Sequence, residues 1–187
     1  MSLPDGRRGD ARHKKMLSAW GPVAARPWKE SLVAGVGGFV AIFALASARA
    51  DLSANVLIAP FGASCVLVFA IPQSPLAQPR NVIGGHLIST VAGLSVLGQT
   101  PLAFALGVGL AITAMLLTGT VHPPAGADPI VVIFASASWP FLFAPVLIGT
   151  ICIVLLGAGF HRWVTRKAYP LGTLGVSAQL LGGTKAK

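Results

Sequence analysis

The sequence predicts an all-α fold, a polytopic transmembrane helical bundle, from its composition and from where its charges lie. Of its 187 residues, 54% are hydrophobic and only 10% are charged, and the mean hydropathy is +0.76. Soluble domains carry about a quarter charged residues. Between Leu52 and Phe160 the only charged side chains are those of Arg80 and Asp128. A soluble protein with such a stretch would expose large apolar patches, so we expect the chain to lie in a lipid bilayer.

The remaining charges are mostly basic and gather at the two ends of the chain, giving a formal net charge of +9. Lys and Arg clustered beside membrane spans predict two cytoplasmic termini. No basic patch is interleaved with stacking aromatic residues, so we expect no nucleic-acid partner. The basic residues are Arg7, Arg8, Arg12, Lys14, Lys15, Arg26 and Lys29 before the first span and Arg162, Arg166, Lys167, Lys185 and Lys187 after the last.

This charge distribution divides the chain into three regions. Residues 1–30 are predicted to form a basic cytoplasmic or interfacial segment, residues 31–163 the transmembrane domain, and residues 164–187 a flexible basic tail. The opening "MSLPDGRRGDARHKK" has neither the apolar run of a signal peptide nor the composition of a transit peptide. We therefore expect the protein in a bacterial inner (plasma) membrane.

The transmembrane domain contains four uninterrupted apolar runs and two broken ones, where a spanning helix needs about 20 apolar residues. The uninterrupted runs cover residues 31–48, 81–98, 101–119 and 140–160; the broken ones cover residues 53–71 and 119–139. Four or six crossings would both leave the two tails on one side. Six are favoured, because the loop with Arg80 then faces the cytoplasm, as positive charge prefers.

The two halves of this domain partly match after a shift of 64 residues. "APFGAS" (59–64) then falls on "PPAGAD" (123–128), which pairs Pro60 with Pro124 and Gly62 with Gly126. The match suggests two three-helix repeats, about 31–98 and 101–163, each with a broken helix in the middle. If each repeat crosses three times, the second is inverted. Inverted repeats with broken helices are a recurrent plan of transporters, with the site at the repeat interface.

The two breaks also suggest an anion site. Proline suits the first turn of a helix, so Pro60 and Pro124 mark helix starts within the membrane, and the following glycines leave backbone amides uncovered. Such a start combines unpaired donors with the positive end of the helix dipole. The alternative is that the breaks only kink the helices and that local groups cap the freed amides.

Polar side chains beside the breaks complete the predicted site. His122 could bind an anion or cap the preceding helix, and His86 is more typical of a hydrogen-bonded packing residue. Asp128 would repel an anion unless it is protonated, paired with Arg80 or at the interface; with His122 it is a candidate for proton coupling. Asn81, Ser64, Ser89 and Thr90 fit either a lining role or ordinary helix–helix hydrogen bonds. The predicted substrate-binding residues are His122, Pro124, Gly126, Ala127, Pro60, Gly62, Ala63, Ser64, Arg80, Asn81 and His86.

The sequence offers no pattern of a catalytic or cofactor site. It contains no Ser-His-acid set that can be placed, no P-loop and no Cys or His cluster with metal spacing. Cys65 and Cys152 lie inside apolar runs and are interpreted as buried thiols. We therefore expect neither enzymatic activity nor a cofactor.

The stretches "HPPAGADPI", "APFGASCVLVF" and "SPLAQPRNVIGGH" resemble the HPP family of integral membrane proteins, named for its His-Pro-Pro signature. The resemblance covers roughly residues 27–160. It implies four transmembrane segments, where our count favours six, and a small-anion transporter with nitrite as the first candidate. The residues that match the signature are His122, Pro123, Pro124, Ala125, Gly126 and Ala127, and those that match the other two blocks are Pro60, Gly62, Ala63, Pro79, Arg80, Asn81, Gly84, Gly85 and His86.

Two other functions are left open by the sequence: transport of another small anion or proton-coupled solute, and a non-transporting membrane module that binds a ligand or scaffolds a partner. The expected partners are a small inorganic anion and the lipid bilayer. Because 187 residues are few for a complete pathway, we also expect a homodimer or higher homo-oligomer.

Overall fold

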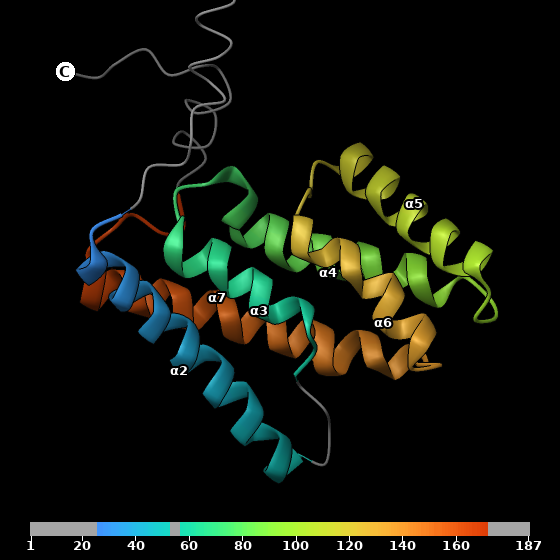
Figure 1. Cartoon of the computed structure of the whole chain (residues 1–187), viewed down its shortest axis with the longest axis horizontal. Coiled ribbons are helices and arrows are strands. Elements are labelled where there is room, and N and C mark those ends of the chain that lie inside the picture. Colours follow the sequence, from blue (N-terminus) through green and yellow to red (C-terminus); the bar gives the residue numbers. More distant parts are fainter. Residues whose placement is uncertain (1–25, 53–56, 172–187) are drawn as a thin grey trace, which may run out of the picture.

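The computed structural model describes residues 26–52 and 57–171, and all regular elements within these ranges are helical. The predictions for residues 1–25 and for the tail beyond residue 171 lie outside these ranges. The elements are α2 (Trp28–Leu52), α3 (Pro60–Cys65) continued by η1 (Val66–Ala70), η2 (Pro75–Ala77), α4 (Pro79–Leu94), α5 (Pro101–Thr118), η3 (Pro123–Ala127) continued by α6 (Asp128–Phe134), η4 (Trp139–Leu142), η5 (Phe143–Leu147), α7 (Ile148–Phe160) and η6 (His161–Thr165). Figure 1 shows their arrangement.

Three helical segments of the described chain are long and apolar enough to cross a membrane: Trp28–Ala48, Pro101–Thr118 and Trp139–Thr165. Pro60–Ala70 and Pro123–Phe134 are shorter apolar helices, and they coincide with the two predicted breaks. α4 has 16 residues, somewhat below the length of about 20 that spans a bilayer. The predicted all-helical membrane fold is confirmed, while the number of crossings stays a prediction.

Proline occurs in the first turn of most of the inner helices, as predicted at Pro60 and Pro124. α3, α4, α5 and η3 each have proline in the first turn, where its missing N–H removes no helical hydrogen bond. At α5, Thr100 caps the helix by accepting from the Ala103 amide at 3.2 Å, and Gly119 ends it with φ of 64°. Because glycine adopts this left-handed conformation without steric cost, the chain can turn there into the His-Pro-Pro stretch.

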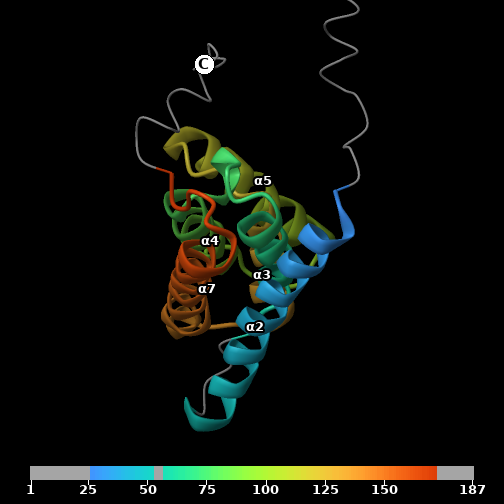
Figure 2. The same ribbon diagram turned by 90° about the vertical axis from the view of Figure 1, so that its left-hand side faces the viewer.

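α2 contacts the bundle along one narrow stripe. Gly37, Ala41 and Leu45 are buried at helical spacing, whereas most of its other apolar side chains are exposed. It packs on α3, η1 and α7, and its last turns extend away from the other helices (Figures 1 and 2). A helix that is apolar on all sides and mostly exposed requires an apolar solvent, which is the bilayer.

α4 lies at the centre of the bundle and packs against α5, α6 and α7. Small residues make its close contacts possible. A Cβ at Gly93 would lie 2.6 Å from the Cα of Pro129 and closer still to Val132. Close backbone approach at glycine is the usual means by which membrane helices associate, because lipid provides no hydrophobic force between them.

Several ends of the helices lie together. Lys167 Nζ, beyond η6, is 3.4 Å from Glu30 Oε2 in the first turn of α2, and the Leu171 amide donates to Gln78 Oε1 at the start of α4 at 2.8 Å. Arg80 Nη2 donates to the Thr118 carbonyl at the end of α5 at 2.8 Å. The start of α2, the loop before α4 and the segment after η6 therefore share one end of the bundle.

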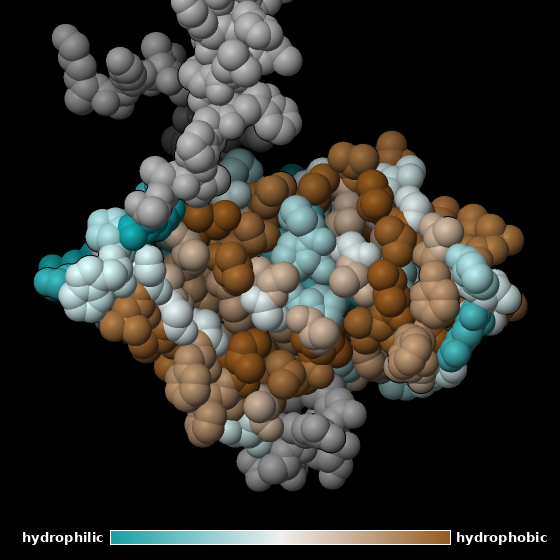
Figure 3. Space-filling view, viewed as in Figure 1, coloured by the Kyte–Doolittle hydropathy of each residue, from teal (hydrophilic) through white to brown (hydrophobic). Residues whose placement is uncertain are grey.

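The exposed surface is that of a protein surrounded by lipid between two polar ends. Hydrophobic residues cover much of the face in Figure 3, between a hydrophilic end beside the start of α2 and a smaller hydrophilic patch at the opposite end. Large apolar side chains such as those of Phe39, Leu106, Leu117 and Leu155 are exposed on the bundle. The chain is an integral membrane protein by both its exposed surface and its helix lengths.

We expect Gly93→Ala to destabilise the bundle by about 1–3 kcal/mol, because the added methyl group meets the backbone of Pro129. Gly109→Ala on α5 is the matched control, since a Cβ there meets nothing within 4 Å and alanine favours helix. Thermal unfolding in detergent measures both. Equal midpoints for the two variants would contradict the packing described here.

The six-crossing arrangement places residues 73 and 168 on the cytoplasmic side and residue 97 on the other side. Gln73, Ala168 and Leu97 are all exposed, so each can be replaced by Cys in a background without Cys65 and Cys152 and labelled with an impermeant maleimide. We expect Leu97→Cys to react in intact cells, and Gln73→Cys and Ala168→Cys to react only after lysis. Labelling of Gln73→Cys in intact cells would favour re-entrant segments.

Candidate functional site

A buried chain of polar side chains runs across the bundle where α3, α4 and η3–α6 meet. Ser64 comes from α3, His86 from α4, His122 from the residue before η3, and Asp128 from the start of α6. All four have a relative exposure of 0%. Polar groups at such a position need hydrogen-bond partners, because the surroundings offer no water to replace them.

The Ser64 hydroxyl connects the two imidazoles. Its Oγ lies 2.8 Å from His86 Nε2 and 2.8 Å from His122 Nε2, and 3.3 Å from the Pro60 carbonyl. At the outer ends, His86 Nδ1 is 2.7 Å from Asp128 Oδ2, and His122 Nδ1 is 2.8 Å from the Leu76 carbonyl. The order is therefore Leu76 carbonyl, His122, Ser64, His86 and Asp128.

The carbonyl at one end determines where the protons lie. A carbonyl only accepts, so His122 Nδ1 carries a hydrogen and donates to Leu76. When His122 is neutral, its Nε2 accepts from the Ser64 hydroxyl, whose oxygen then accepts from a protonated His86 Nε2. The remaining proton lies between His86 Nδ1 and Asp128 Oδ2. This assignment follows from hydrogen-bond accounting.

A second arrangement keeps every one of these hydrogen bonds. His86 passes its Nε2 proton to the Ser64 oxygen while Ser64 passes its own proton to His122 Nε2. His122 is then the imidazolium, His86 is neutral and donates through Nδ1 to the Asp128 carboxylate. Both arrangements hold the same number of protons and have no net charge. With one proton fewer, two acceptors would face each other without a hydrogen, either at Ser64 or between His86 Nδ1 and Asp128 Oδ2. The geometry therefore fits one shared proton.

Asp128 ends the chain with one oxygen occupied and one free. Its Oδ2 also accepts from Thr90 Oγ1 at 3.4 Å, whereas Oδ1 is buried without a hydrogen-bond partner in the described structure. A buried carboxylate oxygen without a partner is costly. The sequence left open a pairing of Asp128 with Arg80; the structure pairs it with His86.

Close contacts between α4 and the His-Pro-Pro stretch hold these groups in register. A Cβ at Gly85 would lie 2.7 Å from the Cβ of His122, so only glycine fits at this crossing. On α4, Asn81 Nδ2 donates to the Val121 carbonyl at 2.8 Å and Ser89 Oγ donates to the Ala125 carbonyl. The Phe61 ring packs edge-on against His86, with centroids 5.3 Å apart.

The backbone amides at the two breaks are already hydrogen-bonded. At Pro60, the amides of Phe61 and Gly62 donate to the Ile58 and Ala59 carbonyls at 3.1 Å. After Pro124, the Ala125 amide donates to the His122 carbonyl at 2.9 Å. These turns correspond to the alternative of local capping, and binding of an anion at either start stays a prediction.

The other predicted site residues lie at different distances from the chain. Gly62, Ala63 and Ala127 are exposed, and Gly126 is half-buried, although each is close in sequence to Ser64 or Asp128. A Cβ at Gly62 or Gly126 would meet nothing within 4 Å. Arg80 is exposed in the first turn of α4, and its guanidinium donates to the Thr118 carbonyl. It therefore lies at the end of the bundle and not in the buried polar chain.

Sequence reasoning placed no Ser-His-acid set, and the structure corrects this: Ser64, His86 and Asp128 form a hydrogen-bonded row. The three residues come from three different elements, so no local motif reveals them. The only available signals were their position in an apolar stretch and the 64-residue match that pairs Ser64 with Asp128.

The described residues contain no group of His, Cys, Asp or Glu that could hold a metal ion.

The comparisons with known proteins agree with the sequence pattern. Residues 23–170 match the family described as "HPP, transmembrane region". The chain belongs to this family. It is 36% identical to one transmembrane protein of Dictyostelium discoideum over 132 residues, 65% of this chain and 46% of that protein. It is also 36% identical over 126 residues to a second one, covering 62% of this chain and 40% of that protein.

The chain thus spans less than half the length of the curated relatives it matches. No solved structure matches it. The HPP family membership confirms the predicted resemblance and shows an integral membrane protein. The matched residues include all four residues of the buried polar chain.

We expect the buried His86–Asp128 pair to show strong coupling in a double-mutant cycle. His86→Phe or Asp128→Leu alone leaves one buried polar partner uncompensated and should cost about 3–5 kcal/mol. The double variant should cost clearly less than the sum of the two, because neither charge remains. Thermal unfolding in detergent measures all four corners, and strictly additive losses would show that the two side chains do not interact.

Proposed function

We propose that this HPP family protein transports a small monovalent anion across the membrane together with a proton, nitrite being the first candidate. The observation that carries the proposal is the buried chain of His122, Ser64, His86 and Asp128, in which one proton can move between two histidines. Titratable residues inside a membrane domain mark substrate or proton pathways by default.

The chain has the properties of a proton relay. Its three inner hydrogen-bond distances are 2.7–2.8 Å, within the range for direct proton transfer. Moving the proton across Ser64 breaks no hydrogen bond and leaves the chain of four side chains neutral as a whole. The same Ser-His-Asp order serves nucleophilic catalysis in hydrolases, but here Ser64 is 0% exposed and bonded to a second histidine. These contacts favour a relay over an enzyme.

Proton coupling also accounts for a carboxylate beside an anion site. Asp128 would repel an anion, unless the anion is neutralised as it passes. A proton given up by the relay would form an O–H bond with nitrite and yield neutral nitrous acid, and a proton from the side on which nitrite entered would restore the relay. A doubly charged anion would still carry one charge after it accepted a proton, and it would lose far more solvation than a monovalent anion on entering the membrane. Sulfate is therefore a poor substrate on this scheme.

The two helix starts remain the proposed places of first contact for the anion. The open space over Gly126 leaves room beside Pro124, and at both Pro60 and Pro124 the dipoles of the short helices favour negative charge. The amides of Phe61, Gly62 and Ala125 would have to exchange their present carbonyl partners for the anion. Such exchange is within reach of short turns, whose bonds are not part of a long helix.

The helix contacts support the inverted-repeat part of the proposal. The proposed repeats make α2 equivalent to α5, α3 to α6 and α4 to α7. A two-fold axis between the repeats would then convert the contact α2–α7 into α5–α4, and the contact α3–α7 into α6–α4. All four pairs are in contact, as a two-fold relation requires. On this scheme the chain crosses six times in a bacterial plasma membrane with both termini cytoplasmic, and copies associate as a dimer or higher oligomer.

Transport by protein in liposomes tests the proposal. We expect the wild-type chain to admit nitrite faster than empty liposomes and to acidify the interior at the same rate, more so at lower external pH, because the relay must be reloaded with a proton. Ser64→Ala removes the bridging hydroxyl and should reduce the protein-dependent flux about 100-fold. An internal pH-sensitive dye and a nitrite assay follow the proton and the anion separately.

Ser95→Ala is the matched control, since that hydroxyl is exposed and binds only the Val91 carbonyl. Full nitrite flux in Ser64→Ala would contradict the relay. If nitrite, nitrate, formate and chloride all fail to move at every pH, transport itself is wrong. The chain would then be a membrane module that binds a ligand or scaffolds a partner. If only another small solute moves, the substrate is wrong and the relay stands.

A further inference from the structure

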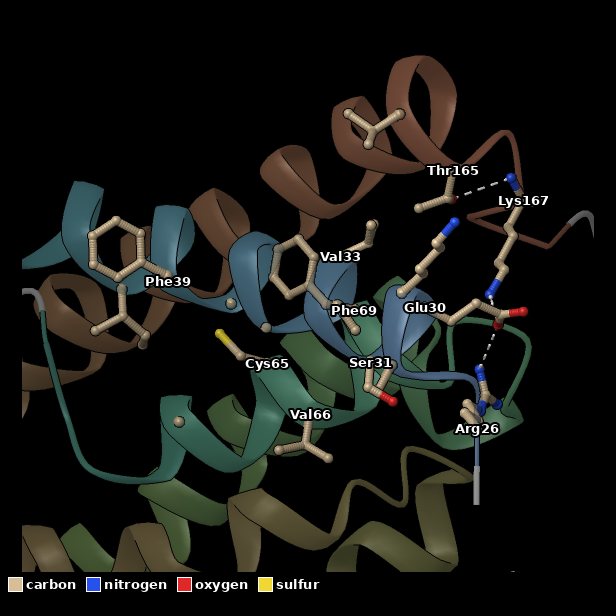
Figure 4. A pocket seen from close by; sticks show the side chains of 18 of the residues that line it. Arg26, Glu30, Ser31, Val33, Phe39, Cys65, Val66, Phe69, Thr165 and Lys167 are labelled. Carbon is tan, nitrogen blue, oxygen red and sulfur yellow. Dashed lines mark hydrogen bonds and ion pairs between the residues drawn. The ribbon is translucent and has the colours of Figure 1, made fainter. Parts of the chain in front are cut away.

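A long groove lies between α2 and the α3–η1 helix, on the opposite side of α3 from the buried Ser64. Its volume is about 1080 Å³, at the upper end of the roughly 300–1,000 Å³ of ligand pockets. Most of the wall is apolar, with α2 on one side and Cys65, Val66 and Phe69 on the other. Figure 4 shows these side chains around the open space.

The shape of α2 creates this groove. Because the fully buried residues of α2 form one stripe of Gly37, Ala41 and Leu45, part of its neighbouring face is left open beside α3. Gly38 approaches Cys65, with an added Cβ only 3.7 Å from the Cys65 Cβ, and forms the floor. Gly35 and Gly62 have no atom within 4 Å of where a Cβ would be, so the groove is open above them.

One end of the groove is basic. Among the residues that the structure describes, Arg26, Lys29 and Lys167 line it together with one carboxylate, Glu30. Glu30 Oε2 lies 4.0 Å from Arg26 Nη1 and 3.4 Å from Lys167 Nζ, and Lys29 Nζ lies 5.7 Å from the Trp28 ring centroid. Three cations therefore face one anion, and Figure 4 shows Arg26 and Lys167 on either side of Glu30. The excess positive charge lies at the end of the bundle where tryptophan and basic residues meet the headgroup layer.

We propose that this groove binds an anionic phospholipid, with an acyl chain along α2 and α3–η1 and the phosphate at Arg26, Lys29 and Lys167. The apolar wall and the basic end have the same order as the two parts of such a lipid. Basic pockets at the ends of membrane helices favour anionic headgroups over zwitterionic ones. The lipid source is the surrounding bilayer, which reaches the groove along its open side.

The occupant is a lipid rather than a small solute because the groove lacks polar groups along its length. Ser31 and Thr165 lie near the basic end, whereas the middle is lined by Phe39, Cys65 and Phe69. A second copy of the chain would have to place an apolar helix in the groove and leave the three cations facing it unmatched. Bound lipid would fill the space that α2 leaves beside α3 and thereby fix α2 against the helix that carries Ser64.

Native mass spectrometry of the full chain with added phosphatidylglycerol or phosphatidylcholine tests the site. We expect retained phosphatidylglycerol on the wild-type chain, and about a fivefold loss of affinity for each cation replaced in Arg26→Gln, Lys29→Gln and Lys167→Gln. Arg162→Gln with Arg166→Gln is the matched control, since these exposed cations lie outside the groove and should leave binding unchanged.

Two glycine variants test the acyl-chain part separately. Gly35→Leu fills the groove and should abolish phosphatidylglycerol retention, whereas Gly109→Leu, on an open face of α5, should not. Unfolding midpoints show that both variants are folded. Equal retention of the two lipids, or unchanged retention in Gly35→Leu, would overturn the proposal. A change of oligomeric mass in Gly35→Leu with no lipid bound to the wild type would also overturn it and would assign the groove to a second copy of the chain.

Discussion

The arrangement of the helices depends on one constraint: polar groups buried in the bilayer core must bind each other, because no water is present to bind them. Ser64 satisfies this constraint for two histidines at once, and Asp128 and the Leu76 carbonyl satisfy the outer nitrogens. Four segments far apart in the sequence are thereby held at hydrogen-bond distance. The glycines on α4 are a consequence of this constraint. Gly85 allows His122 to approach within reach of Ser64, and Gly93 allows α6 to lie directly on α4. In an apolar solvent such contacts determine the packing more than apolar burial does.

The all-helical membrane fold could be predicted because it depends on local features of the sequence. Apolar runs, first-turn prolines and the left-handed Gly119 specify where helices begin and end without reference to other segments. The exact ends were less predictable: α2 begins at Trp28 and α4 stops at Leu94, because apolarity alone does not distinguish the last turn of a helix from the loop that follows. The cluster was predicted only in part. His122, His86, Ser64 and Asp128 were all candidates, but the register that joins them depends on how three helices cross. Sequence spacing contains no information on that crossing.

Under the proposed duplication, the two halves would carry different chemistry at equivalent positions. The 64-residue shift pairs Ser64 with Asp128 and His86 with Thr150. Ser64 and Asp128 lie on the two sides of the same imidazole, while Thr150 is buried and donates to the Val146 and Leu147 carbonyls of its own helix. Ser64 and Asp128, which are equivalent positions, therefore both contact His86, whereas the hydroxyl of Thr150 is already hydrogen-bonded within its own segment. A duplicated scaffold with a single titratable centre suits a device that moves one proton in each cycle.

The position of Asp128 at one end of the buried polar chain makes its two proton arrangements unequal. Both proton arrangements of the chain are neutral, yet they place the shared proton differently: between His86 and Asp128, or on His122, with Ser64 and His86 between it and the carboxylate. In the first arrangement the proton lies directly at the carboxylate, whereas the second leaves Asp128 with only hydrogen bonds to stabilise it. An anion that arrives beside His122 would reverse this preference, because it provides His122 with a counterion. The anion thus draws the proton toward itself across Ser64 and away from Asp128. Under the proposed function, coupling between anion and proton would then follow from electrostatics alone, without a large change in the helices.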